Sequence, residues 1–87
     1  MMKTWKTLIT DEMKRRGETF EQLVSCTLSG EQLHEEFDAG YGEEKGANFT
    51  AWTANRVYFP VGYDGAEWCG SAPRNPSGEA TEHQGGG

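Results

Sequence analysis

Long apolar runs are missing from this chain of 87 residues. No stretch approaches the roughly 20 apolar residues of a membrane span, or the apolar core of a secretory signal peptide. We therefore expect no membrane association and a cytoplasmic protein. Cysteine is also scarce, since Cys26 and Cys69 are the two present and their spacing matches no metal or redox motif. In a reducing compartment both should be free thiols, and we expect no metal site.

Aliphatic residues and positive charge are in short supply as well. Leu, Ile, Val and Phe together number 12 of 87 residues, below the roughly 20% at which disorder becomes a concern for a highly charged chain. Three Trp and three Tyr predict a folded, aromatic-rich core instead, because each large aromatic buries much area. Lys and Arg number 8 against 14 Asp and Glu, a net charge of −6. Direct nucleic-acid binding is not expected, because it needs a basic face.

What the sequence does contain is a β-hairpin over residues 56–63 and 66–74. Asp64-Gly65 has the composition of a two-residue type I′ turn. Folding the chain on that turn pairs Tyr63 with Ala66, Val61 with Trp68, Phe59 with Gly70 and Val57 with Ala72. These residues share one face of the hairpin, and we expect that face to pack on helices. The opposite face carries Arg56, Tyr58, Gly62, Glu67, Cys69 and Ser71.

Pro60 limits where a further strand can pair. Counting from the turn, its nitrogen points away from the hairpin partner, and proline has no N–H to donate there. Residues 49–53 are either a third strand or an extended lead-in to the hairpin. A further strand must therefore lie beside 66–74 or stop short of Pro60, which leaves 56–63 as an edge over that part.

The first half of the chain predicts two to three short helices. Residues 3–16 place Trp5, Leu8, Ile9 and Met13 on one stripe and end before Gly17. Capping-box signals predict two more helices. One starts at Thr19 with Gln22 and presents Phe20, Leu23, Val24 and Leu28; the other starts at Ser29 with Gln32 and runs through Leu33 and Phe37 to near Gly40.

These patterns predict an α+β fold. The two to three short N-terminal helices pack on a small antiparallel sheet built on the hairpin 56–63/66–74. Residues 1–74 form a single small domain. Residues 75–87 have no periodicity and little to bury, so we expect a flexible C-terminal tail.

An acidic segment, residues 31–44, is the strongest candidate for a functional surface. It holds six acidic residues and no basic one: Glu31, Glu35, Glu36, Asp38, Glu43 and Glu44. Such a segment is either a surface complementary to a basic partner or a solvated face that keeps a small protein soluble. Aromatic residues that the hairpin register does not assign to its core face are candidate anchors: Tyr41, Trp52 and Tyr58. Partial burial in the core is the alternative for Trp52.

Features of an enzyme are weak. His34 and His83 are the only histidines, and no nucleophile–base arrangement has local support. The glycines between Gly40 and Gly46 do not fit the dinucleotide fingerprint. We expect no catalytic residues and no cofactor.

Four stretches of the second half resemble small bacteriophage and prophage proteins that carry no assigned activity: FTAWT at 49–53, RVYFP at 56–60, YDGAEW at 63–68 and PRNP at 73–76. The resemblance assigns no site residues. It implies a phage accessory protein in the host cytoplasm, a class that often binds and inhibits a host protein.

The function expected from the sequence is therefore a non-catalytic protein-binding module that binds or inhibits a host factor through an acidic surface. A homo-oligomeric structural or assembly component is the alternative, using the exposed edge of strand 56–63 or spare aromatics. A small enzyme or ligand-binding domain is a third interpretation, and it would need a pocket lined by His34 and nearby carboxylates.

Overall fold

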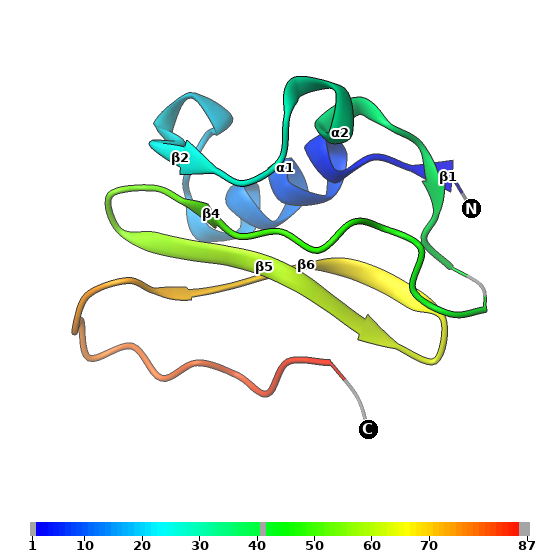
Figure 1. Ribbon diagram of the computed structural model, residues 1–87. Helices are drawn as coiled ribbons and strands as arrows, with labels where there is room; N and C mark the ends of the chain where they lie inside the picture. The colour runs from blue at the N-terminus through cyan, green and yellow to red at the C-terminus, as the bar shows by residue number, and fades with distance from the viewer. Residues whose placement is uncertain (1, 41, 86–87) are drawn as a thin grey trace.

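The computed structural model of the protein describes residues 2–40 and 42–85. One long helix lies across one face of a four-stranded antiparallel sheet of order β2-β4-β5-β6 (Figure 1). The helix is α1 (Trp5–Arg16), and the strands are β2 (Ser25–Cys26), β4 (Ala51–Trp52), β5 (Arg56–Tyr63) and β6 (Ala66–Pro73). A second, two-stranded sheet pairs β1 (Met2–Lys3) with β3 (Phe37–Asp38). The α+β class predicted from the sequence is confirmed.

Helix α1 forms as its stripe predicts. Thr4 caps it by accepting a hydrogen bond from the Thr7 backbone N–H at 3.2 Å, and Gly17 ends it with a left-handed φ of 77°. All four stripe residues, Trp5, Leu8, Ile9 and Met13, are buried. The helix starts two residues later than predicted, because Met2 and Lys3 pair with β3. Among the described residues, no helix is long and apolar enough to cross a bilayer.

The second predicted helix is wrong. Its capping box is present, with Gln22 Oε1 accepting from the Thr19 N–H at 2.8 Å, but only the single 3₁₀ turn η1 (Phe20–Gln22) follows. The Val24 N–H donates to Trp52 O at 2.7 Å, and Ser25–Cys26 then pair with β4. Pairing with the sheet thus replaced a longer helix, because helix nucleation is costly in a short segment.

The third predicted helix is present but shorter. It is α2 (Gly30–His34), capped by Ser29 and Gln32 as the sequence indicates. Phe37 does not extend the helix, because it belongs to β3 and packs its ring against Trp5 with a centroid distance of 5.0 Å.

The hairpin register is confirmed at every predicted pair. Tyr63 faces Ala66, and the ladder continues through Val61–Trp68, Phe59–Gly70 and Val57–Ala72. Asp64 and Gly65 have φ values of 51° and 86°, as a type I′ turn requires. Residues 51–52 form a third strand, β4, which pairs with Val57 and Tyr58 and stops short of Pro60, one of the two arrangements predicted.

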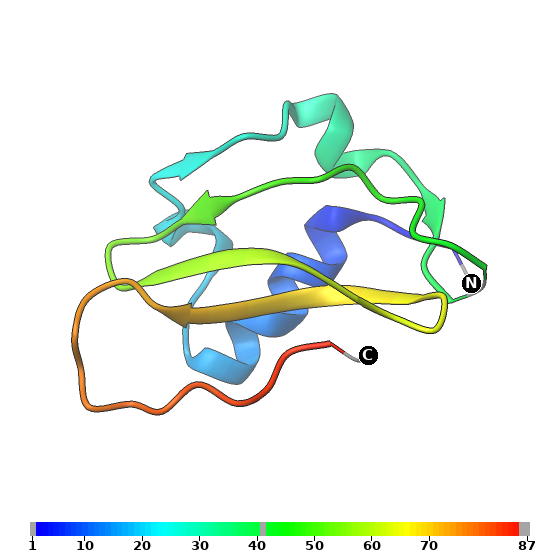
Figure 2. The same cartoon turned by 60° about the horizontal axis from the view of Figure 1, so that its bottom comes forward.

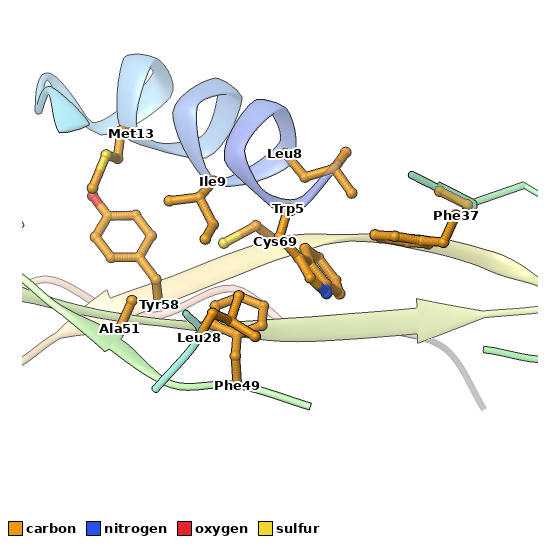
Figure 3. Packing of buried hydrophobic residues seen from close by; sticks show 11 residues of the cluster. Trp5, Leu8, Ile9, Met13, Leu28, Phe37, Phe49, Ala51, Tyr58 and Cys69 are labelled. Atoms are coloured by element: carbon orange, nitrogen blue, oxygen red, sulfur yellow. The ribbon is translucent and has the colours of Figure 1, made fainter. Parts of the chain in front are cut away.

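The face of the hairpin that packs on α1 is the opposite of the predicted one. Tyr58 and Cys69 point from the sheet toward α1 and join the core (Figure 3). Phe59 and Trp68 are half-buried, and Tyr63 is exposed. The prediction failed because the inward face also carries polar residues, which find buried partners from distant parts of the chain: Arg56, Glu67 and Ser71.

The chain beyond β6 is not a detached tail. Residues 75–85 form no helix or strand, but they turn back and run alongside β6 (Figures 1 and 2). Glu79 pairs with Arg56 and Glu82 pairs with Arg16. A Cβ built on Gly85 would lie 3.2 Å from Val61 Cγ1, so the segment reaches the outer face of the hairpin.

Candidate functional site

The acidic segment lies at the surface on α2 and on the chain that follows it. Five of its carboxylates are exposed: Glu31, Glu35, Glu36, Glu43 and Glu44. Asp38, in β3, is partly buried. Lys45 directly follows the segment and is exposed as well. The structure therefore leaves most of the predicted charge open to solvent.

A buried carboxylate anchors the end of this segment to the sheet. Glu67 of β6 is 6% exposed, and it accepts hydrogen bonds from the backbone N–H groups of Lys45 and Gly46 at 2.6 and 3.0 Å. These charge-assisted bonds repay the desolvation of the carboxylate. The loop that carries Glu43 and Glu44 thus has a fixed end.

Of the three predicted aromatic anchors, the prediction for Tyr58 is wrong. It is 0% exposed, and its hydroxyl donates a 2.6 Å hydrogen bond to the buried carboxylate of Glu18. Trp52 is half-buried in β4, and Tyr41 lies outside the described residues. The register alone could not show that the face carrying Tyr58 is the inner one, because the polar residues on that face indicate exposure to solvent.

Tyr63 is an exposed aromatic that the sequence analysis assigned to the core. It stands at the end of β5 with 53% of its surface exposed. A β-bridge between Gly40 and Ala66 brings the tip of the hairpin next to the acidic segment. The position of Tyr63 beside the Asp64-Gly65 turn is the signal that could have predicted its exposure, because the tip of a hairpin projects beyond the helix that covers its centre.

Two hydrogen-bonded groups of buried polar side chains were also missed. In the first, Ser71 Oγ donates to Glu12 Oε2 at 2.7 Å and accepts from Arg56 Nε at 3.1 Å. Arg16 Nε donates to the same Glu12 oxygen at 2.8 Å. This chain of contacts joins α1, β5 and β6, so one end of the core is held by charged and hydroxyl groups.

The second group surrounds Glu18. Its two carboxylate oxygens accept from Thr53 Oγ1 at 3.0 Å each, and one of them also accepts from Tyr58. Burial and the adjacent Glu18 carboxylate raise the pKa of Tyr58 well above its usual range, so its hydroxyl stays protonated as a donor.

A polar cavity of about 430 Å³ opens beside these groups. It lies between the end of α1, the start of β5 and the chain after β6, and its polar lining includes Arg16, Glu18, Gln22, Asn55, Arg56 and Glu79. On its wall, the two terminal nitrogens of Arg56 donate directly to the Glu79 carboxylate at 3.0 and 3.2 Å. The arrangement suits the binding of a charged group.

The other potentially reactive side chains do not lie at that cavity. His34 is exposed, and its Nδ1 lies 2.9 Å from Gly30 O. Burial raises the pKa of the Cys69 thiol far above its usual range, which suppresses the reactive thiolate. Within residues 2–40 and 42–85, no three His, Cys, Asp or Glu side chains are arranged to hold a metal ion.

Comparison of the chain with protein-family models, with curated proteins and with solved structures finds no match.

Proposed function

We propose that this protein is a non-catalytic protein-binding module that contacts a basic surface of its partner through the acidic segment. The observation that carries the proposal is the exposure of Glu31, Glu35, Glu36, Glu43 and Glu44, five carboxylates within fourteen residues that contain no cation. Asp38 extends this charge into β3.

Electrostatic steering is the main contribution expected from this surface. Exposed charges add little affinity individually, but a field of one sign raises the association rate with an oppositely charged protein by roughly 10- to 1,000-fold. Tyr63, exposed beside the segment, supplies a rigid aromatic of the kind that anchors interfaces. Trp52 offers a half-buried aromatic surface on β4.

The resemblance of the second half of the chain to phage proteins adds a biological context to this proposal. In that context the partner is a host protein, and binding to it inhibits that protein. A nucleic-acid-binding host protein is a suitable class, because carboxylates on the segment could occupy a groove built for phosphates.

A charge-reversal pair tests the proposal. The variant Glu35→Lys/Glu36→Lys changes the acidic segment, and Asp11→Lys/Glu21→Lys makes the same change in net charge at exposed positions outside it. Each protein is used as bait in host lysate, and captured proteins are identified by mass spectrometry. We expect one basic partner with the native chain and the control variant, and its loss with Glu35→Lys/Glu36→Lys. Equal capture by all three proteins would refute the role of the acidic segment.

The homo-oligomeric alternative also has a specific observation in its favour. Strand β6 is the edge of the four-stranded sheet, and β5 is its only full-length partner among the described strands. Beyond the bridge between Gly40 and Ala66, that edge can add a second copy of the chain. Light scattering across a hundredfold range of concentration distinguishes the two, since a monomer throughout excludes this alternative.

A further inference from the structure

We propose that Arg56, on the wall of the polar cavity, binds a carboxylate of an acidic peptide, and that the chain's own Glu79 takes the place of that carboxylate in this structure. The ligand is an extended segment of a partner protein that presents carboxylates three residues apart. The proposal is independent of the acidic segment, because it concerns another part of the surface and a ligand of the opposite charge.

Arg56 has the geometry of a carboxylate receptor. Its side chain is 9% exposed, and its two terminal nitrogens donate to the two oxygens of Glu79 at 3.0 and 3.2 Å. This paired arrangement matches the planar guanidinium to a planar carboxylate, which a lysine ammonium cannot do.

The receptor is held in place by groups other than the ligand. Arg56 Nε donates to Ser71, which is fully buried and in turn donates to Glu12 on α1. The bond from Nε therefore orients the guanidinium, while its two terminal nitrogens bind Glu79. Such pre-organisation reduces the entropy that a ligand must lose on binding.

The present occupant is attached weakly enough to exchange. Glu79 is 40% exposed and belongs to a segment without helix or strand. Among the described residues, no backbone group of 76–85 hydrogen-bonds to the backbone of the sheet. Side-chain contacts therefore hold this segment in place.

The bound segment also indicates what the ligand looks like. Glu82, three residues after Glu79, lies 3.8 Å from Arg16, the second arginine of the cavity. Two carboxylates in an extended chain thus meet two arginines. We infer that the sequence pattern Glu-x-x-Glu, in an extended conformation, is the ligand that the site accepts.

Competition between the two ligands follows mass action. A tethered segment of this length has an effective concentration of order millimolar, so an external peptide must displace it and its apparent affinity falls. Removing the internal carboxylates should raise the affinity for an external peptide without any new contact. We expect a gain of about tenfold.

The test uses a fluorescent peptide with the sequence of residues 75–85, added in trans and followed by anisotropy. The receptor is the full chain carrying Glu79→Gln/Glu82→Gln, compared with the native chain. We expect the variant to bind the peptide about tenfold more tightly than the native chain. Adding Arg56→Lys to the variant should abolish binding, because lysine keeps the charge but loses the fork. A peptide with glutamine at both acidic positions should not bind.

Two results would overturn the proposal. One is a folded Glu79→Gln/Glu82→Gln variant that ignores the peptide or binds the glutamine peptide equally well, because Glu79 would then be a purely structural tether. If that variant does not fold, the peptide is titrated to millimolar concentration onto the native chain while the Arg56 Nε–H resonance is followed by NMR. A shift that saturates supports displacement of Glu79, and an unchanged resonance refutes it.

Discussion

Buried ionisable side chains dominate this protein at the scale of single residues. Glu12 and Glu18 are 3% and 8% exposed, and each accepts hydrogen bonds from hydroxyl groups of the sheet. A buried carboxylate costs several kcal/mol unless such donors replace water, about as much as a small domain can tolerate. The hydroxyl donors are therefore needed to keep these carboxylates stable in the interior.

Removing one of these donors should show the effect. Tyr58→Phe deletes the hydroxyl that donates to Glu18 at 2.6 Å and leaves the ring in place. We expect the free energy of unfolding, measured in urea, to fall by about 1–3 kcal/mol, because a buried acceptor loses a partner. Tyr63→Phe is the control, since that side chain is exposed and its change should lie within about 0.5 kcal/mol. Equal effects at both positions would contradict this account of the Glu18 group.

Alkaline pH should destabilise the folded state. Burial raises the pKa of both Tyr58 and Cys69, so the folded chain holds their protons while the unfolded chain releases them. The stabilisation is complete below the unfolded values of about 8.5 for Cys and 10 for Tyr and is lost as pH rises above them. Each group should remove about 1.4 kcal/mol per pH unit beyond its unfolded pKa. Urea unfolding at pH 7–11 measures this slope, and Tyr58→Phe should lack the part above pH 10.

Single residues also show why the buried polar groups and the cavity were not predicted. From the sequence, Arg56 and Ser71 are expected to face solvent, because they lie on the side of the hairpin that carries polar residues. Their partners are Glu12, fifty-nine positions from Ser71, and Glu79, twenty-three positions from Arg56. Local periodicity carries no information about contacts of that range, so the buried polar groups and the cavity required the structure.

At the scale of elements, signals between adjacent residues predicted the structure correctly. Competition between elements that are distant in the sequence could not be predicted. The Asp64-Gly65 turn determines the hairpin register, and Pro60 limits β4, because both effects act through the backbone of adjacent residues. The helix predicted from Thr19 had a correct cap, but its next residues pair with β4 instead. Nothing between 19 and 28 reveals that β4, which begins twenty-five residues after Cys26, competes for them.

The loop that carries Glu43 and Glu44 should depend on a close approach at Gly46. A Cβ added there would lie 2.7 Å from Trp5 Cζ2 and 2.8 Å from Phe37 Cζ. We expect Gly46→Ala to lower the free energy of unfolding by about 1–3 kcal/mol through overpacking. Gly30→Ala has open space around the new methyl group and should change it by less than about 1 kcal/mol. Thermal or urea unfolding of both variants checks this, and a harmless Gly46→Ala would contradict the packing described.

The segment after β6 should detach in acid. The hydrogen bonds from Arg56 lower the pKa of Glu79 below its usual range. Because the folded value is the lower one, the contact contributes fully above the unfolded pKa of about 4.3 and is lost as pH falls through the folded value. Heteronuclear NOE measurements on residues 76–85 should show rising mobility below about pH 4 in the native chain. Glu79→Gln should be mobile at neutral pH, and a segment that stays ordered in that variant would contradict the role of Glu79.

At the scale of the whole molecule, the sequence predicted the α+β class and the surface position of most of the acidic segment. It could not predict which hairpin face packs on α1, because both faces carry apolar and polar residues. The molecule that results has exposed acids on α2 and its following loop, and a polar cavity on whose wall Arg56 pairs with the chain's own Glu79. The exposed acids suit a basic partner, and the arginine suits an acidic one.

The most direct test of the proposed function is the association rate with the captured basic partner, measured by stopped flow as salt is varied. We predict that the native rate falls steeply with ionic strength, and that Glu35→Lys/Glu36→Lys is at least about tenfold slower at low salt. Asp11→Lys/Glu21→Lys should stay close to native, since it alters the same net charge elsewhere. Equal rates and equal salt dependence for all three proteins would contradict the claim that the acidic segment is the binding surface.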